Sequence, residues 1–336
     1  MSITSLAPSA TPTKGESHRW SSLPGVSAAA TLYEKVIKQN VFALVITHNA
    51  AESQEWLEAL RFFSANDQQF CLFELPDREV LPYDYFSPHP DITSERLNTL
   101  YHLQSQSCGV CVVTLPTLMT RLCSKDYINR DSLILRVGQQ LETSALKNQL
   151  DDAGYQHRDT VFEHGEYAVR GSLLDIYPMG SEQPYRIDLF DDEISSLRTF
   201  DPESQRSLGK IEHIAILPAA EVCLDEQAIN HFRDQWHIEF ENNASDCPIY
   251  QDVLAGIPYA GIESYLPMFY SSTSTLLDFI PADSLIISLP GNHQQATSFI
   301  HNVNERFQQQ AIDPTRPLLS PAKLYLDVDE YFTLLA

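Results

Sequence analysis

The stretch Val41-Phe42-Ala43-Leu44-Val45-Ile46 is an unbroken apolar run of strand length. A strand that is apolar at every position is typical of a parallel sheet that helices cover on both faces. A second strand candidate covers residues 70–75, residues 109–115 suit a third, buried strand, and the intervals between them leave room for helices. The sequence therefore predicts an α/β fold built on a parallel sheet.

Helical patterns occupy the intervals around these strands. Residues 28–39 suit a helix before the first strand, and residues 94–104 suit one before the third. After the first strand, Asn49 is a candidate N-cap, with Glu52 at the capping-box spacing. One helical stripe then follows, made of Trp56, Leu57, Leu60 and Phe63.

The middle of the chain has a different pattern. A short helix over residues 143–152, closed by Gly154, precedes β-rich sequence that runs to residue 217. Beyond Pro218, residues 226–241 and 294–309 suit helices, and residues 284–289 suit a buried strand. We therefore predict a flexible tail, an α/β domain, an inserted small α+β domain and a return segment, over residues 1–19, 20–132, 133–217 and 218–336.

The charge of the chain limits the partners it can have. Its 22 Lys and Arg residues against 45 Asp and Glu residues give a formal net charge of −23. Because phosphate contacts require Lys and Arg, this balance argues against a stand-alone nucleic-acid binder and favours basic protein partners or simply solubility. No apolar run approaches the ~20 residues that span a bilayer, and the N-terminus lacks a signal-peptide core. We expect a cytoplasmic protein with no membrane contact.

The sequence contains few signs of metal or catalytic chemistry. Cys108 and Cys111 have the spacing of zinc ligands, but no second pair supplies the four ligands that zinc needs, so reduced core cysteines are favoured. The carboxylates of Asp191, Asp192 and Glu193, close to Asp188, stand where a strand should end, which favours a solvated turn over a Mg²⁺ site. No nucleophile motif is present, so we expect no catalytic residue and no metal.

His89 lies among prolines and aromatic residues in residues 81–90, LPYDYFSPHP. This composition favours a rigid structural loop over a ligand site.

The turn into the first helix lacks most of what a phosphate-binding loop requires. Such a loop needs glycines, a Lys for the phosphate oxygens and a Ser or Thr for Mg²⁺. Gly25 is present, but Ala28 and Ala30 follow it, and the first Lys is Lys35. From its residues alone, we interpret this segment as an ordinary helix start.

Residues 185–190 carry the most suggestive surface. Arg186, Asp188 and Phe190 alternate with apolar residues and therefore share one face of a predicted strand. An exposed Phe beside an Arg is typical of a binding hot spot, and Arg170 lies nearby if its strand pairs with this one. The alternative is a second layer that buries Phe190 as core. The spacing favours neither.

Long motifs in the chain resemble a known family. Residues 165–178 (GEYAVRGSLLDIYP) and 184–201 (PYRIDLFDDEISSLRTFD) resemble the UvrA-binding domain shared by UvrB and the transcription-repair coupling factors (Mfd). Residues 81–90, 94–101, 260–269 and 313–319 are similar to the coupling factors specifically. The resemblance implies a degenerate P-loop-like domain 1a/1b with an inserted domain 2. It also implies UvrA contacts at Arg170, Arg186 and Phe190.

The resemblance also shows where the chain departs from a nucleotide-binding enzyme. Comparison with the P-loop of UvrB puts Thr31 at the lysine position and Leu32 at the position of the Mg²⁺-binding hydroxyl. We therefore expect an inactive nucleotide site with no cofactor. The expected function is a non-catalytic scaffold that recruits UvrA to RNA polymerase stalled at DNA lesions. Contacts with RNA polymerase and DNA are expected from parts that would follow Ala336. The alternative is an ATP-binding, UvrB-type helicase segment.

Overall fold

The computed structural model describes residues 20, 23, 26–130, 132–222, 224–240 and 244–335. The predicted tail of residues 1–19 and the candidate Gly25 lie outside the described residues.

A parallel sheet forms the base of the molecule. It contains β1 (Phe42–Thr47), β2 (Leu72–Leu75), β3 (Gly109–Thr114) and β12 (Leu285–Ser288) in the order β12-β1-β3-β2. All its strand pairs are parallel, and every residue of β1 and β3 is buried, as their apolar runs predicted. The prediction that residues 284–289 form a buried strand is wrong in one respect. Because β12 has only one neighbouring strand, its residues are at most half-buried.

Helices cover both faces of this sheet. On one face, α1 (Ser27–Gln39) and α2 (Ala50–Ser64) pack against alternate residues of β1 and β3. On the other face, α3 (Pro90–Leu103) contributes to the main core, together with α4 (Leu115–Leu118) and α5 (Lys125–Arg130). The predicted cap of α2 is present, because Asn49 Oδ1 accepts a hydrogen bond of 3.0 Å from the Glu52 amide. The Glu52 carboxylate accepts from the His48 amide, one residue earlier than a capping box requires.

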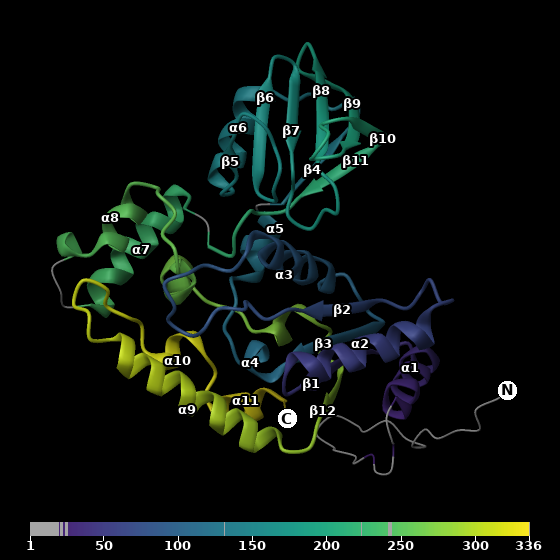
Figure 1. The fold of residues 1–336 in the computed structure, drawn as a ribbon, viewed down its shortest axis with the longest axis vertical. Coiled ribbons are helices and arrows are strands. Elements are labelled where there is room, and N and C mark those ends of the chain that lie inside the picture. The colour runs from purple at the N-terminus through teal and green to yellow at the C-terminus, as the bar shows by residue number, and fades with distance from the viewer. Residues whose placement is uncertain are drawn as a thin grey trace.

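The middle of the chain forms smaller sheets that stand apart from the parallel sheet (Figure 1). One sheet has the strand order β10-β9-β8-β7-β6-β5 and packs against α6 (Thr143–Asp152). Its strands are β5 (Gln156–His157), β6 (Glu166–Arg170), β7 (Leu173–Ile176), β8 (Tyr185–Phe190), β9 (Glu193–Phe200) and β10 (Ser207–Ile211). A two-stranded sheet at its base pairs β4 (Leu133–Arg136) with β11 (His213–Ile216).

The last third of the chain returns to the parallel sheet. It contains α7 (Glu226–Glu239), α8 (Pro248–Leu254), α9 (Asn292–Gln310), α10 (Pro321–Leu324) and α11 (Val328–Leu335), with 3₁₀ segments η1 (Ala244–Asp246), η2 (Ile262–Phe269) and η3 (Leu276–Phe279). Helix α7, which lies within the predicted helix of residues 226–241, packs inward through Phe232 and Trp236. The fold is thus mixed α/β, with a parallel sheet and separate smaller sheets.

The inserted sheets rest on the N-terminal half of α3. The Gly180 amide donates a hydrogen bond of 2.8 Å to Ser94 Oγ, at the contact between the two parts. Beside it, the ring nitrogens of His164 lie 2.8 Å from Oδ1 of Asp91 and from the carbonyl oxygen of Ser181. These contacts position the six-stranded sheet above α3.

A buried ion cluster holds the chain where it leaves the inserted sheets. The Glu221 carboxylate accepts hydrogen bonds from Arg78, which follows β2, and from Arg96 of α3. Burial alone would raise the pKa of Glu221, but the charges of Arg78 and Arg96 outweigh it and lower that pKa to about 2. The return segment is therefore fixed to the parallel-sheet domain by charge as well as by packing.

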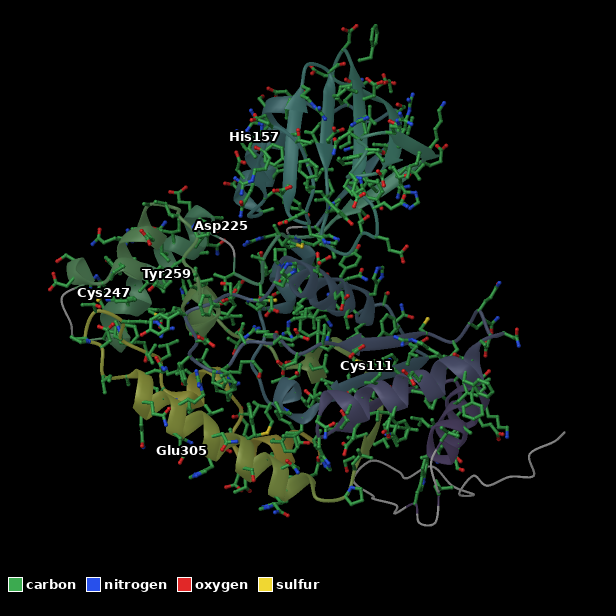
Figure 2. All side chains as sticks on the ribbon, in the orientation of Figure 1. Cys111, His157, Asp225, Cys247, Tyr259 and Glu305 are labelled. Carbon is green, nitrogen blue, oxygen red and sulfur yellow. The ribbon has the colours of Figure 1, made fainter. Side chains whose placement is uncertain are left out.

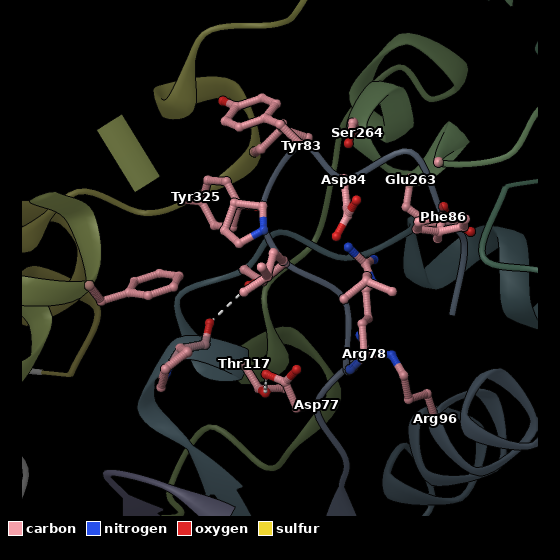
Figure 3. A pocket seen from close by; sticks show the side chains of 18 residues that line it. Asp77, Arg78, Tyr83, Asp84, Phe86, Arg96, Thr117, Glu263, Ser264 and Tyr325 are labelled. Carbon is pink, nitrogen blue, oxygen red and sulfur yellow. Dashed lines mark hydrogen bonds between the residues drawn. The ribbon is translucent and has the colours of Figure 1, made fainter. Parts of the chain in front are cut away.

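Next to this cluster lies a cavity of about 90 Å³ at the carboxyl ends of β2 and β3. Arg78 and Arg96 line it together with the acidic residues Asp77, Asp84 and Glu263 (Figure 3). Charged residues of both signs therefore share the lining of this small cavity.

The cysteines of the described residues are free thiols. Cys111 lies within the parallel sheet (Figure 2), and burial raises the pKa of its thiol to about 12. The nearby Cys108 is half-buried just before β3. No three His, Cys, Asp or Glu residues gather as metal ligands within the part of the chain that is described. Over that same part, every helix is too short or too polar to cross a bilayer.

Candidate protein-binding face

The six-stranded sheet has one face turned toward α6 and one turned away from it. On β8, Ile187 and Leu189 are buried in the core, so Arg186, Asp188 and Phe190 lie on the outer face, as their spacing predicted. The same alternation places the following residues of β6 and β7 on that outer face: Ala168, Arg170, Leu173 and Asp175.

Arg170 and Arg186 meet at one carboxylate. Their strands do not pair directly, since β7 lies between β6 and β8. From this central strand, Asp175 accepts a hydrogen bond of 2.5 Å from Arg170 Nη2. It also accepts bonds of 2.7 and 2.9 Å from Nε and Nη2 of Arg186. The predicted proximity of the two arginines is therefore real, but it is established through an acidic residue on a third strand.

Further contacts fix Arg186 in place. Its Nη1 donates hydrogen bonds of 3.2 Å to the Gln205 carbonyl oxygen and to Ser207 Oγ. Its guanidinium carbon lies 4.8 Å from the centroid of the Phe200 ring, a cation–π arrangement. The hydrogen bonds to Asp175 raise the pKa of Arg186. The guanidinium therefore has a fixed orientation and a permanent charge.

Phe190 lies at the open end of this face. Its side chain is 72 % exposed, so the alternative that a second layer buries it as core is wrong. The tight turn after it is formed by Asp191 and Asp192, with φ angles of 47° and 62°, and both side chains are exposed as a solvated turn requires. Loops do cover the opposite end of the face, where Val161, Ala168 and Phe200 form a small buried cluster.

We use the term arginine face for Arg170, Asp175, Arg186 and Phe190. Of these, the sequence pointed to all but Asp175. A signal for Asp175 was present, because a charged residue between Leu174 and Ile176 interrupts an apolar run. What the spacing did not reveal was that strands on both sides place an arginine against it.

Thr31 and Leu32, the described residues of the candidate nucleotide site, lie within α1, and both side chains make contacts inside the protein. The Thr31 hydroxyl donates a hydrogen bond of 2.8 Å to the Ser27 carbonyl oxygen, one turn back. Leu32 is fully buried in the core between α1 and the sheet. One turn further on, Lys35 is buried with its Nζ 5.7 Å from the centroid of the Trp20 ring, and burial lowers its pKa.

Comparison with known proteins identifies the region that carries the arginine face. Residues 133–221 match the family model of the UvrB interaction domain. The chain is 44 % identical over 320 residues to a transcription-repair-coupling factor of Escherichia coli K12, with 95 % of this chain and 28 % of the relative covered. This chain is homologous to the transcription-repair-coupling factors. All four residues of the arginine face lie within its UvrB interaction domain.

Other coupling factors match over nearly the same span. The chain is 42 % identical over 309 residues to that of Haemophilus influenzae, covering 92 % of this chain and 26 % of the relative. It is 30 % identical over 301 residues to that of Rickettsia prowazekii, covering 88 % of this chain and 26 % of the relative. The chain therefore spans between a quarter and a third of the length of these relatives. The residues that match the UvrB interaction domain lie in the middle of this chain.

Proposed function

We propose that this chain is a non-catalytic, UvrB-like scaffold whose UvrB interaction domain binds UvrA. In this proposal the arginine face is the contact surface. By binding UvrA, the scaffold recruits the excision-repair machinery to RNA polymerase stalled at DNA lesions. Contacts with RNA polymerase and DNA belong to other parts of such a factor.

The observation that carries this proposal is the exposure of Phe190 on the same sheet face as two arginines that share the Asp175 carboxylate. A large apolar side chain that is 72 % exposed at the end of a strand contributes nothing to the core. Aromatic residues and arginines dominate the binding energy of protein interfaces. Because Asp175 and the covering loops hold Arg186 still, little conformational entropy is lost when a partner binds.

The state of α1 supports a non-catalytic role. A P-loop lysine and its neighbouring hydroxyl reach the phosphates and Mg²⁺ from the start of a helix. Here the hydroxyl of Thr31 is bonded within α1, and Leu32 is core. The first lysine of α1 is Lys35, which is buried against the Trp20 ring and does not lie at the start of the helix. These features favour the scaffold over the ATP-binding alternative, and we propose that the segment needs no cofactor.

The test is the affinity of the chain for purified UvrA, measured by calorimetry for the wild type and for Arg170→Ala. Arg233→Ala is the matched control, because its side chain is 47 % exposed against 48 % for Arg170, and it lies on α7. We expect binding by the wild type and by Arg233→Ala, with a loss of at least about tenfold for Arg170→Ala. Equal affinities of the two variants would show that UvrA does not use the arginine face.

A further inference from the structure

We infer that Asp175 is the positioning residue of the arginine face: it touches no partner, yet it aligns Arg170 and Arg186 for binding. This inference rests on the proposed contact with UvrA. It assigns a role to a side chain that is only 1 % exposed and therefore lies out of reach of any partner.

Asp175 accepts hydrogen bonds from two arginines, and both of its carboxylate oxygens are used. Its Oδ1 accepts from Arg186 Nε, while its Oδ2 accepts from Arg186 Nη2 and from Arg170 Nη2. Hydrogen bonds between ions are about twice as strong as neutral ones, and the fork of a guanidinium matches a carboxylate on two atoms. The buried carboxylate therefore fixes the orientation of the Arg186 guanidinium through two bonds and holds Nη2 of Arg170 close to it through a third.

The two arginines differ in what they leave available. Arg186 makes four hydrogen bonds, to Asp175, Gln205 and Ser207, and its side chain is only 17 % exposed. Within the part of the chain that is described, the Arg170 guanidinium makes a single hydrogen bond, to Asp175, and its side chain is 48 % exposed. Arg170 thus has N–H groups available to a partner. Arg186 instead fixes the position of the Asp175 carboxylate, to which Arg170 is bonded.

This division of roles separates positioning from simple stabilisation. If Asp175 only stabilised the sheet, its loss would lower the melting temperature and leave the affinity of the folded protein unchanged. If it positions Arg170, its loss lowers the affinity of the folded protein, because Arg170 must then be ordered when the partner binds.

The test is Asp175→Asn, with Asp188→Asn as the matched control. Both changes remove one negative charge from the same face, but no hydrogen bond or ion pair of the Asp188 carboxylate occurs among the described residues. For Asp175→Asn we expect UvrA affinity at least about tenfold weaker than that of Asp188→Asn, at a temperature where both variants are folded. Equal affinities of the two folded variants would overturn the inference.

A second variant covers the case in which Asp175→Asn does not fold. Arg186→Lys keeps the charge, but an ammonium group cannot engage both oxygens of Asp175 together with Gln205 and Ser207. We expect it to weaken UvrA binding several-fold although the net charge is the same. Wild-type affinity in this variant would contradict the role of the Asp175 brace.

A measurement without UvrA keeps this inference separate from the proposed function. In NMR spectra of the wild-type chain, the Nε–H of Arg186 should exchange slowly with water, because it donates to buried Asp175. We expect fast exchange in Asp175→Asn and slow exchange in Asp188→Asn. A wild type that does not bind UvrA but shows this pattern would overturn the proposed function only. Fast exchange in the wild type would overturn the positioning role.

Discussion

Arg96 of α3 donates a hydrogen bond of 2.5 Å to Glu221, which stands 125 residues later in the chain at the exit from the inserted domain. Both side chains are almost fully buried, and Arg78 donates to the other oxygen of the same carboxylate. This contact ties the chain, where it leaves the inserted sheets, to the part that carries the parallel sheet, so we expect it to contribute strongly to the stability of the fold.

Glu221→Gln should therefore be strongly destabilising. Removing one partner of a buried ion pair costs about 3–5 kcal/mol, because the remaining charges stay buried without compensation. Chemical unfolding in urea measures this loss. The control is Glu239→Gln, which removes the exposed ion pair with Lys323 and should cost no more than about 1 kcal/mol. Similar losses in the two variants would mean that the buried cluster adds no particular stability.

The same carboxylate predicts a pH dependence. In the folded chain the charges of Arg78 and Arg96 outweigh the effect of burial and lower the pKa of Glu221 from 4.5 to about 2. Its contribution to stability is then complete above pH 4.5 and is lost as the pH falls toward 2, since the unfolded chain binds the proton first. The difference in unfolding free energy between wild type and Glu221→Gln should shrink across that window. A difference that does not change with pH would contradict this assignment.

Phe190→Ala should weaken UvrA binding without changing the stability of the chain. The side chain is largely exposed, so its removal leaves no cavity, while the loss of an aromatic hot spot costs about 2 kcal/mol or more. Phe62→Ala is a matched control, because Phe62 is 76 % exposed on α2 of the other domain. Affinity measured by surface plasmon resonance should fall for the first variant only. A parallel fall for Phe62→Ala would point to a non-specific apolar effect.

Gly180→Ala should disturb the seat of the inserted domain on α3. Gly180 has a φ angle of 79°, and an added Cβ would come within 2.8 Å of Asn98 Oδ1 and 3.0 Å of Leu217 Cδ1. In Gly256→Ala, the φ of 69° gives the same backbone strain, about 1–2 kcal/mol, but the Cβ meets open space. The melting temperature should therefore fall further for Gly180→Ala. Equal falls in melting temperature for the two variants would show that the contact with α3 accommodates the added Cβ without loss of stability.

Magnesium ATP should not stabilise the chain. A ligand present at 100 times its dissociation constant adds about 2.7 kcal/mol to the stability of a protein that binds it. Because Thr31 and Leu32 leave no hydroxyl or cation directed at a phosphate, we expect no rise in the melting temperature with millimolar nucleotide. A reproducible rise would restore the ATP-binding alternative and require a site other than the start of α1.

Local sequence patterns predicted the elements of this protein well. The apolar runs of β1 and β3 and the alternation in β8 state directly which faces are buried, because side-chain direction repeats every two residues along a strand. The same periodicity placed Arg186 and Phe190 together on an outer face. It did not reveal that β12 is an edge strand, because a short apolar run has the same composition at the edge of a sheet as at its centre.

The sequence by itself determined the fold class, the acidic balance and the outward direction of Arg186 and Phe190. Only the tertiary structure decided that Arg170 joins them, because this requires β7 to lie between β6 and β8 in the register that puts Asp175 opposite Arg186. It likewise decided that Glu221 meets Arg78 and Arg96. Strand order and long-range ion pairs depend on how distant segments pack, and spacing along the chain carries no record of that packing.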